Sequence, residues 1–292
     1  MSNIHTDLTL TLRGGRTLGF ATYGPEDGTP VIHFNGSGCS RLEHPPQLDM
    51  LDELNIRFIS TDRPGHGLSD PHENRSFEDW TKDVAQLADH LGVERFYVDG
   101  WSAGGPYALA CAYYLPERVI AGASLSGLAP YDRPGPYKGL GGPIRLWMFL
   151  CRCIPPLVTP FRRMMFNSIS KSPPGKIGKM MSEHGLEADK HAISSKEAQD
   201  MMDRNIQEGY RQGWRGPVQD DLLINAPWPF ELANIQTRFD VWQGALDVNV
   251  PLHLGECIHD RLPNSTLRVL ENEGHLFPVY RWKEILEALI RP

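Results

Sequence analysis

Hydrophobic and polar residues alternate near the start of the chain, and further along short apolar runs are followed by amphipathic segments. Leu8 to Leu12 and Thr17 to Ala21 alternate around a glycine-containing turn, which predicts an antiparallel hairpin. Beyond the hairpin, apolar runs of strand length are each followed by residues with helical periodicity. Repeated strand–helix units of this kind predict a mainly parallel sheet with helices on both faces.

The expected elements can be placed along the first half of the chain from these patterns. We expect strands at 31–34, 57–60, 96–98 and 120–125, and helices at 48–54, 79–91 and 103–114. Ser76, followed three residues later by Asp79, supplies a capping sequence for the second of these helices. Two more strand-like runs, 239–242 and 266–270, are each followed by a helical pattern.

The strand–helix series is interrupted in the middle of the chain. From about Tyr131 to Pro227, prolines and glycines are frequent and separate short helical patches. We therefore expect an α/β core made of residues 1–131 and 228–292, with a mostly helical cap, residues 132–227, inserted after the sixth strand. Seven of the nine methionines fall in this cap. Their flexible side chains suit an adaptable apolar pocket, although simple packing is the commoner role of methionine.

Composition and charge limit the classes of partner. The 292 residues are 40% hydrophobic and carry a formal net charge of −7, without a basic run interleaved with aromatic residues, so nucleic acid is not an expected partner. Between Lys138 and Lys190, however, nine Lys and Arg stand against three Asp and Glu. A solvated helical surface is the ordinary interpretation, and a positive lip that attracts acidic substrates or anionic lipid is the alternative.

Cysteine usage and hydropathy predict a cytoplasmic protein without an integral membrane segment. The five cysteines are scattered and too few for a disulfide framework, and Cys151 and Cys153 lack the partners that a metal site would need. The polar residues 1–10 lack the apolar region of a signal peptide, and no apolar run reaches about 18 residues. The oligomeric state stays open, and a homodimer is one alternative.

A serine lies at a sharp turn between an expected strand and an expected helix, within the sequence Gly100–Gly104. Such a turn strains the serine backbone and crowds the positions two before and two after it, where only glycine fits. The hydroxyl of Ser102 is then exposed at a helix N-terminus, where free backbone N–H groups can stabilise an oxyanion. Pro106 agrees with a first helical turn. Ser102 is therefore a candidate nucleophile.

A serine nucleophile needs a general base, and that base needs a carboxylate to orient it. His275 follows the last expected strand and Asp247 follows the strand before it, so both are expected at the carboxyl edge of the sheet, where Ser102 emerges. Asp132, after the sixth strand, is the alternative acid, and His66, in a glycine-rich turn, is the alternative base. We favour His275 and Asp247.

Four motifs together resemble the α/β-hydrolase fold family, in its capped lipase/esterase, iminopeptidase and epoxide-hydrolase-like branch. They are the residues 35–38 (Asn-Gly-Ser-Gly), the residues 62–69 (Asp-Arg-Pro-Gly-His-Gly-Leu-Ser), the turn around Ser102, and the pair of Asp247 and His275. The resemblance covers about 17–128 and 230–290. It implies a mostly parallel eight-stranded sheet with helices on both faces and an inserted helical cap.

The resemblance also assigns the oxyanion hole, to the backbone N–H groups of Ser37 and Ala103. The family usually has His-Gly before the first of these donors, whereas here Asn35 precedes Gly36 and the nearest histidine is His33. Backbone donors do not depend on that side chain, and Asn35 can supply hydrogen bonds to the loop instead.

The residue at the apex of the sharp turn, Ser102, restricts the reaction. A serine there excludes the aspartate-nucleophile routes of epoxide hydrolysis and dehalogenation. We expect a serine hydrolase that cleaves a carboxylic ester, thioester or lactone of a small to medium hydrophobic substrate through an acyl-enzyme, with no metal or organic cofactor. The alternatives are a C–C bond hydrolase or lyase with the same triad, and a ligand receptor that retains the fold.

Overall fold

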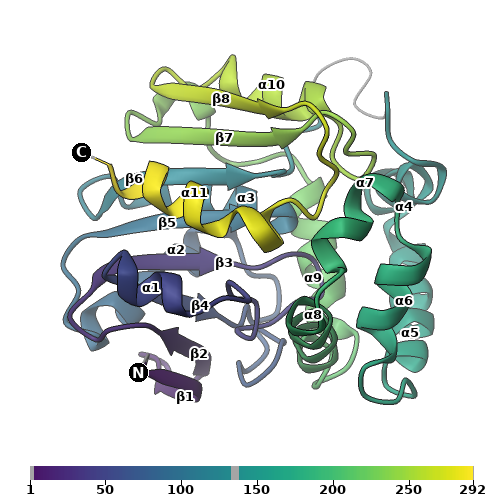
Figure 1. Ribbon diagram of the computed structural model, residues 1–292, viewed down its shortest axis with the longest axis horizontal. Helices are drawn as coiled ribbons and strands as arrows, with labels where there is room; N and C mark the ends of the chain where they lie inside the picture. The colour runs from purple at the N-terminus through teal and green to yellow at the C-terminus, as the bar shows by residue number, and fades with distance from the viewer. Residues whose placement is uncertain (1–2, 133–137, 292) are drawn as a thin grey trace.

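An eight-stranded sheet forms the centre of the computed structural model, which describes residues 3–132 and 138–291 (Figure 1). Its order is β1-β2-β4-β3-β5-β6-β7-β8. β1 pairs with β2 and β2 with β4 in antiparallel fashion, and all other neighbours are parallel. The strands are β1 (Ile4–Thr11), β2 (Thr17–Tyr23), β3 (Thr29–Phe34), β4 (Ile56–Thr61), β5 (Phe96–Trp101), β6 (Val119–Leu125), β7 (Arg238–Gly244) and β8 (Ser265–Leu270). The expected fold class is confirmed.

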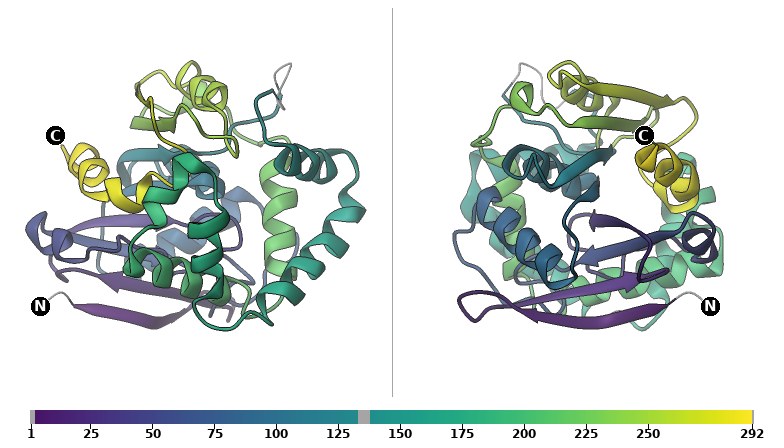
Figure 2. Two further views of the ribbon diagram at one scale, coloured as in Figure 1. Left: turned by 45° about the vertical axis from the view of Figure 1, so that its right-hand side comes forward. Right: turned by 90° about the vertical axis from the view of Figure 1, so that its left-hand side faces the viewer.

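Helices cover both faces of this sheet, and each face has its own apolar cluster. One cluster joins α1 (Asp49–Glu53) and α11 (Pro278–Ile290) to the sheet. The other joins α2 (Phe77–His90), α3 (Gly105–Tyr114) and α10 (Leu252–His259). In the right-hand view of Figure 2, the yellow α11 and the blue helices α2 and α3 lie on opposite sides of the sheet. Parallel strands need this double cover because both of their faces are apolar.

Local signals in the sequence act as predicted at the start of α2. Ser76 accepts a hydrogen bond from the backbone N–H of Asp79, and the Asp79 side chain accepts one from the backbone N–H of Ser76. This capping box satisfies two N–H groups that a helix N-terminus otherwise leaves unpaired. Trp80, Val84 and Leu87 are fully buried on one face of the helix, as their spacing predicts.

The chain between β6 and β7 is helical and lies beyond the carboxyl ends of the parallel strands, at the right in Figure 1. We call residues 142–225 the helical segment. The first proline-rich stretch of the expected insertion, 133–137, lies outside the described residues. No helix in the described ranges is long and apolar enough to cross a membrane. The segment contains α4 (Gly142–Cys153), η2 (Pro155–Leu157), α5 (Val158–Ile169), α6 (Lys176–His184), α7 (Glu187–Lys190), η3 (His191–Ile193), α8 (Lys196–Gly209) and α9 (Arg215–Asn225).

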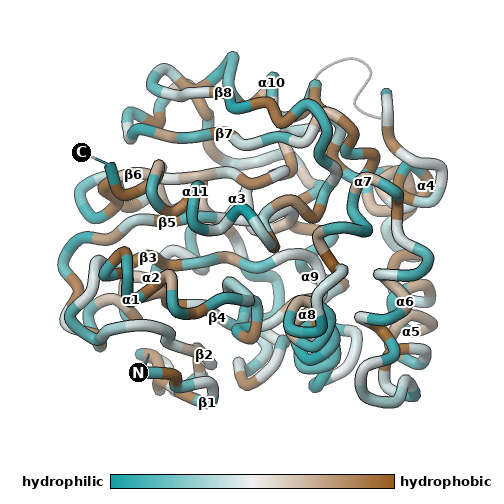
Figure 3. The backbone as a smooth tube through the Cα atoms, in the orientation of Figure 1, coloured by the Kyte–Doolittle hydropathy of each residue, from teal (hydrophilic) through white to brown (hydrophobic). Residues whose placement is uncertain are grey.

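Polar residues are prominent among the buried side chains of the helical segment. α8 is hydrophilic over most of its length (Figure 3), yet it buries Asp203 and Asn205 beside Met201 and Met202. Asp220 and Asp221 of α9 and Arg162 of α5 are also buried. Buried charges are stable only with partners. Asp203 accepts backbone N–H groups at the start of α6, and Arg162 and Asp221 pair with each other. Asn205 and Asp220 reach loops at the carboxyl edge of the sheet, through Ser40 and Arg63.

Candidate active site

The turn that follows β5 holds Ser102 in a left-handed conformation. Ser102 has a φ of +54° and begins the short helix η1 (Ser102–Gly104), after which α3 continues. A Cβ on Gly104 would collide with the Phe34 carbonyl, and one on Gly100 would collide with Gly104. Only glycine fits at these two positions, so the strained serine follows from close packing of the turn against β3.

His275 and Asp247 form a hydrogen-bonded pair at the carboxyl edge of the sheet. The Nδ1 atom of His275 lies 2.7 Å from Oδ2 of Asp247, and both side chains are buried. The other Asp247 oxygen accepts the backbone N–H groups of Asn249 and Val250, each at 2.8 Å. The carboxylate is therefore fixed in place, and it fixes the orientation of the ring.

Ser102 and His275 border the same cavity. No hydrogen bond joins their side chains within the described parts of the chain. The indole of Trp101 donates to the backbone carbonyl of His275 at 3.1 Å, which ties the loop of the histidine to the residue before the serine. In unliganded enzymes such contacts commonly tighten only when substrate binds.

Charged neighbours make His275 a stronger base than an ordinary histidine. Burial acts to lower the pKa of His275, but the charge and hydrogen bond of Asp247 raise it, as do the charges of Asp189 and Glu43. The net result is a raised pKa. A base of this kind accepts a proton readily but becomes protonated at a higher pH than a free imidazole.

The peptide between Gly36 and Ser37, in the loop after β3, is held by hydrogen bonds to its glycine. The Gly36 carbonyl accepts from Nη2 of Arg63 at 2.8 Å, and the Gly36 N–H donates to Oε1 of Glu43 at 3.0 Å. The peptide between Gly36 and Ser37 is trans, so the Ser37 N–H points away from that anchored carbonyl. Within the described residues this N–H has no hydrogen-bond partner, and Ser37 and Ala103 both border the cavity. The two predicted donors are thus brought to one cavity.

Asn35 holds the loop in place of the histidine that the family usually has. Its side-chain amide donates to the Thr61 carbonyl at 2.7 Å, and its side-chain oxygen accepts from Nη1 of Arg63 at 2.7 Å. Arg63 is itself paired with Asp220 of α9 at 2.6 Å. The loop after β3 is therefore anchored to the motif at 62–69 and, through it, to the helical segment.

His33 forms part of a buried charged chain under the same loop. Its two ring nitrogens lie 2.8 Å from Asp99 of β5 and 2.9 Å from Glu43. Burial acts to lower the pKa of His33, but the two carboxylates outweigh it and raise the pKa to about 9. A charged imidazolium therefore balances Glu43, and Glu43 in turn holds the Gly36 N–H. No pattern in the sequence pointed to this role of Glu43.

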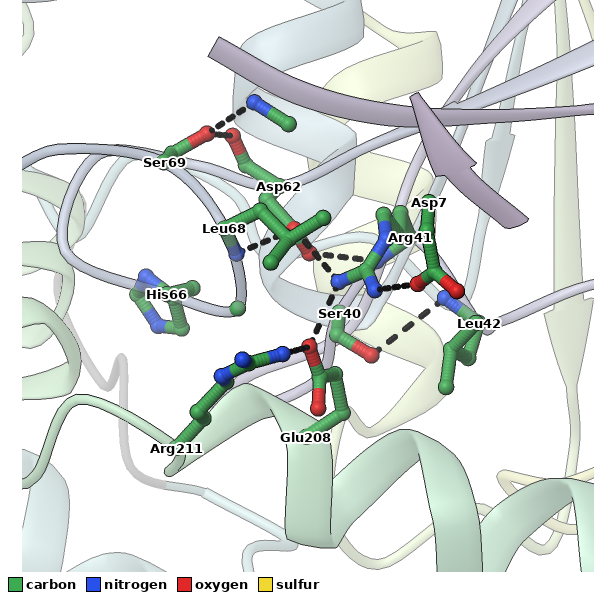
Figure 4. A network of polar contacts seen from close by, with 12 residues as sticks. Asp7, Ser40, Arg41, Leu42, Asp62, His66, Leu68, Ser69, Glu208 and Arg211 are labelled. Carbon is green, nitrogen blue, oxygen red and sulfur yellow. Dashed lines mark hydrogen bonds and ion pairs between the residues drawn. The ribbon is translucent and has the colours of Figure 1, made fainter. Parts of the chain in front are cut away.

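The motif at 62–69 has a structural role, as Figure 4 shows. Asp62 accepts the backbone N–H groups of Arg41 and Leu68 at 2.7 and 2.8 Å and also pairs with the Arg41 guanidinium. Arg41 reaches Glu208 of α8 at 2.7 Å. This cluster joins the N-terminal half of the sheet to the helical segment.

His66 is placed away from the nucleophile. It is fully buried, does not border the cavity and lies 3.5 Å from Asp220. Burial and the positive charges of Arg63 and Arg75 together lower the pKa of His66 to about 3. Asp132, the alternative acid, pairs with Arg261 at 2.8 Å on the surface, whereas Asp247 is the carboxylate in contact with His275.

The cavity has a volume of about 460 Å³ and a mainly apolar wall. Trp147 borders it and also packs against the buried apolar clusters, whereas Phe149 is 43% exposed. Four of the seven methionines of the helical segment line the wall: Met148, Met165, Met181 and Met202.

The basic residues of the helical segment divide into two groups. Arg162 is buried at the cavity and pairs with Asp221 of α9. Others, including Arg145, Arg163, Lys171 and Lys176, are exposed. The surface interpretation thus applies to most of these charges, and Arg162 is the one that reaches the site.

A carboxylate from α7 reaches the loop of the candidate base. Asp189 is buried and accepts the backbone N–H of Leu276 at 2.7 Å. It also packs so closely on Gly274 that a Cβ there would collide with it. No motif in the sequence marked Asp189. The adjacent acids Asp220 and Asp221 were a visible signal in the sequence, but nothing local indicated their partners.

Comparisons with known proteins agree with the fold. The family model described as alpha/beta hydrolase fold matches residues 30–139. The chain is 33% identical over 121 residues to 3-oxoadipate enol-lactonase 1 of Acinetobacter baylyi, covering 41% of this chain and 45% of the relative. It is 30% identical over 194 residues to the uncharacterized hydrolase YcgS of Bacillus subtilis, covering 62% of this chain and 65% of the relative. These matches thus span about half to two thirds of the relatives' own length.

Solved structures resemble the chain over nearly its whole length. The enol-lactonase from Burkholderia xenovorans superposes with a TM-score of 0.66 at 18% identity, covering 97% of this chain and 98% of that one. At this identity, the similarity establishes the fold and leaves the substrate open.

Proposed function

Because the chain belongs to the α/β-hydrolase fold family, we propose that it is a serine hydrolase that cleaves a carboxylic ester, thioester or lactone through an acyl-enzyme at Ser102. One observation carries the proposal. A strained serine, a histidine paired with a buried carboxylate and an unpaired backbone N–H border a single cavity. A nucleophile, an oriented base and an oxyanion donor are the groups that acyl transfer uses.

In the first half of the reaction, the Ser102 oxygen attacks the carbonyl carbon while His275 takes the hydroxyl proton. Asp247 stabilises the imidazolium that forms and keeps the ring in one orientation. The negative charge that develops on the carbonyl oxygen is held by the N–H groups of Ser37 and Ala103. The tetrahedral intermediate then collapses, and His275 gives its proton to the leaving oxygen or sulfur.

In the second half, water hydrolyses the acyl-enzyme. His275 takes a proton from the water, which attacks the acyl carbonyl, and the same two N–H groups hold the second oxyanion. The C–O bond to Ser102 breaks, and the proton on His275 returns to the serine oxygen. The products are a carboxylic acid and the free enzyme, so the cycle balances with water as the only co-substrate.

The cavity supports a small to medium hydrophobic substrate. Its volume of about 460 Å³ suits a short acyl or alcohol group, and apolar side chains dominate its wall. The match to an enol-lactonase favours including lactones among the candidates. We propose that residues 132–227 act as a cap, because helices of this region supply most of the wall. The cytoplasmic location and the absence of a cofactor remain predictions from the sequence.

The test is hydrolysis of p-nitrophenyl esters from acetate to octanoate, together with labelling by a fluorophosphonate. We expect turnover that peaks at a short chain length, and a loss of at least about 10³-fold in kcat for Ser102→Ala. Ser168→Ala, on the exposed side of α5, is the matched control and should change nothing.

Other outcomes would favour other functions. Cleavage of a vinylogous diketone without ester turnover would favour C–C bond chemistry. Tight, saturable ligand binding without turnover would favour a receptor. An unlabelled Ser102 in a protein that binds small apolar ligands would overturn the proposal.

A further inference from the structure

Two adjacent aspartates of α9 reach the loop after β3 through two different arginines. Asp220 pairs with Arg63, whose Nη2 holds the Gly36 carbonyl at 2.8 Å. Asp221 pairs with Arg162 of α5 through two hydrogen bonds of 2.5 and 2.7 Å. Nη2 of Arg162 also donates to Oγ of Ser37 at 2.5 Å. The peptide between Gly36 and Ser37 is thus held at its carbonyl by one pair and at the following side chain by the other.

The hydrogen bonds of Arg162 are already used within the protein. Its Nε and Nη2 atoms donate to Asp221, Nη1 donates to the Tyr210 hydroxyl, and its guanidinium lies over the Trp147 ring at 5.0 Å. The side chain is 5% exposed. Arg162 therefore does not present a free cation to a substrate carboxylate, although it borders the cavity.

The loop that Arg162 contacts has glycines on both sides of Ser37. Ser37 lies between two glycines, and Gly38 adopts a φ of +69°. Tyr210 packs directly on Gly38, and Arg162 in turn bonds the Tyr210 hydroxyl. Glycines on both sides lower the cost of turning the peptide that carries the Ser37 N–H. The contact between Arg162 and the Ser37 side chain therefore adds a second anchor to the one that Arg63 provides at the Gly36 carbonyl, and together they hold that N–H in one direction.

We propose that Arg162 is a positioning residue for the oxyanion hole: through the Ser37 hydroxyl it holds the backbone N–H of Ser37 toward the reacting carbonyl. The inference rests on the proposed function. It implies that the oxyanion hole is complete only when α5 and α9 are docked on the core. A residue of the helical segment thus acts on the chemical step, in addition to any role in enclosing the substrate.

The first test compares Ser37→Ala, Arg162→Gln and the double variant with a p-nitrophenyl ester. Ser37→Ala keeps the backbone N–H and leaves the Arg162–Asp221 pair intact, so it tests the anchor even if Arg162→Gln fails to fold. We expect each single variant to lose about 10-fold in kcat with KM changed less than about twofold, since complete loss of an oxyanion donor costs about 10² to 10³. The double variant should lose about as much kcat as either single variant, because both changes remove the same contact between Arg162 and the Ser37 hydroxyl.

The second test separates transition-state binding from a general structural effect. A trifluoromethyl ketone forms a tetrahedral oxyanion with the serine, so its affinity should fall in both single variants by the same factor as kcat/KM. The matching methyl ketone, which forms little adduct, should bind as before. Arg163→Gln, an exposed neighbour on α5, is the matched control and should leave both affinities unchanged.

Three results would overturn the inference: an unchanged kcat in Ser37→Ala, a rise in KM alone, or losses that multiply in the double variant. Failure of the proposed function looks different. It would be seen in the unaltered protein, as absence of both ester turnover and fluorophosphonate labelling, and both proposals would then fall together.

Discussion

The helices that cover the sheet and the helical segment share the apolar clusters but differ in the polar contacts that they add. α2, α3, α10 and α11 pack on the sheet through large apolar clusters on its two faces. The helical segment adds directed polar contacts to the loops at the carboxyl edge, all of them buried or partly buried: Asp220 to Arg63, Arg162 to Ser37, Asn205 to Ser40, Glu208 to Arg41 and Asp189 to Leu276.

This difference separates stability from activity. Apolar burial is non-directional and tolerates small displacements, so it gives the core its stability without fixing any atom of the site. A buried ion pair or amide contact is satisfied in one geometry only, and it is costly elsewhere. Substitutions in the apolar clusters should therefore change the free energy of unfolding, whereas substitutions at the polar contacts should also change kcat.

Asp220→Asn should have the largest effect on the free energy of unfolding. Asp220 is fully buried and partners both Arg63 and Arg75, and its pKa is lowered because these two cations outweigh the effect of burial. Neutralising it leaves two buried cations without a charge partner, which should cost about 3 to 5 kcal/mol in the free energy of unfolding. Urea unfolding measures the loss.

The same variant should also lose kcat, because Arg63 would release the Gly36 carbonyl. Arg215→Gln, at an exposed position of α9, is the matched control. A stable Asp220→Asn protein with full activity would contradict the claim that the polar contacts of the helical segment affect kcat.

Leu87→Ala, on the buried face of α2, should lower the free energy of unfolding by about 3 kcal/mol through cavity formation, and leave kcat of the folded protein unchanged. Lys82→Ala on the exposed face of the same helix is its control. A loss of kcat comparable to that of Ser37→Ala would contradict the separation between the two regions.

The charged chain at His33 is an exception within the core and should be seen as a pH dependence of stability. The folded pKa of His33 is about 9, above the value of about 6.5 expected when unfolded. A raised folded pKa contributes stability that is fully present below the unfolded pKa and is lost as pH rises through the folded one. We expect the free energy of unfolding to fall by about 2 to 3 kcal/mol between about pH 6.5 and 9. Stability that rises over this window would exclude an imidazolium at His33.

Asp189→Asn should have the smallest effect, a shift in the pH profile. Asparagine keeps an oxygen for the Leu276 N–H but removes a negative charge that raises the pKa of His275. Because the reaction needs neutral His275, the acid limb of kcat/KM should move to lower pH. Glu187→Gln, fully exposed on the same helix, should not move it. A shift to higher pH would mean that Asp189 does not act through its charge.

Much of the fold and part of the site could be predicted because the signals are local. Period-two alternation marked β1 and β2, and the spacing of buried residues and Ser76 marked α2 and its start. Gly100 and Gly104 indicated the strained turn at Ser102, since only a turn that crowds both neighbours needs glycine at both positions. The contact between Asp247 and His275 agrees with an expectation that came from their positions after the last two strands and from the needs of a serine nucleophile.

By itself, then, the sequence determined the strand–helix order, the turn at Ser102 and the edge where the candidate residues meet, because periodicity and turn chemistry depend on neighbours in the chain. Only the tertiary structure decided that Arg162 reaches Ser37, 125 positions away, and that Glu43 and Asp189 support the loops of the site. A charged residue in a sequence carries no mark of its partner. Its burial becomes favourable only once the fold brings an opposite charge within hydrogen-bond distance.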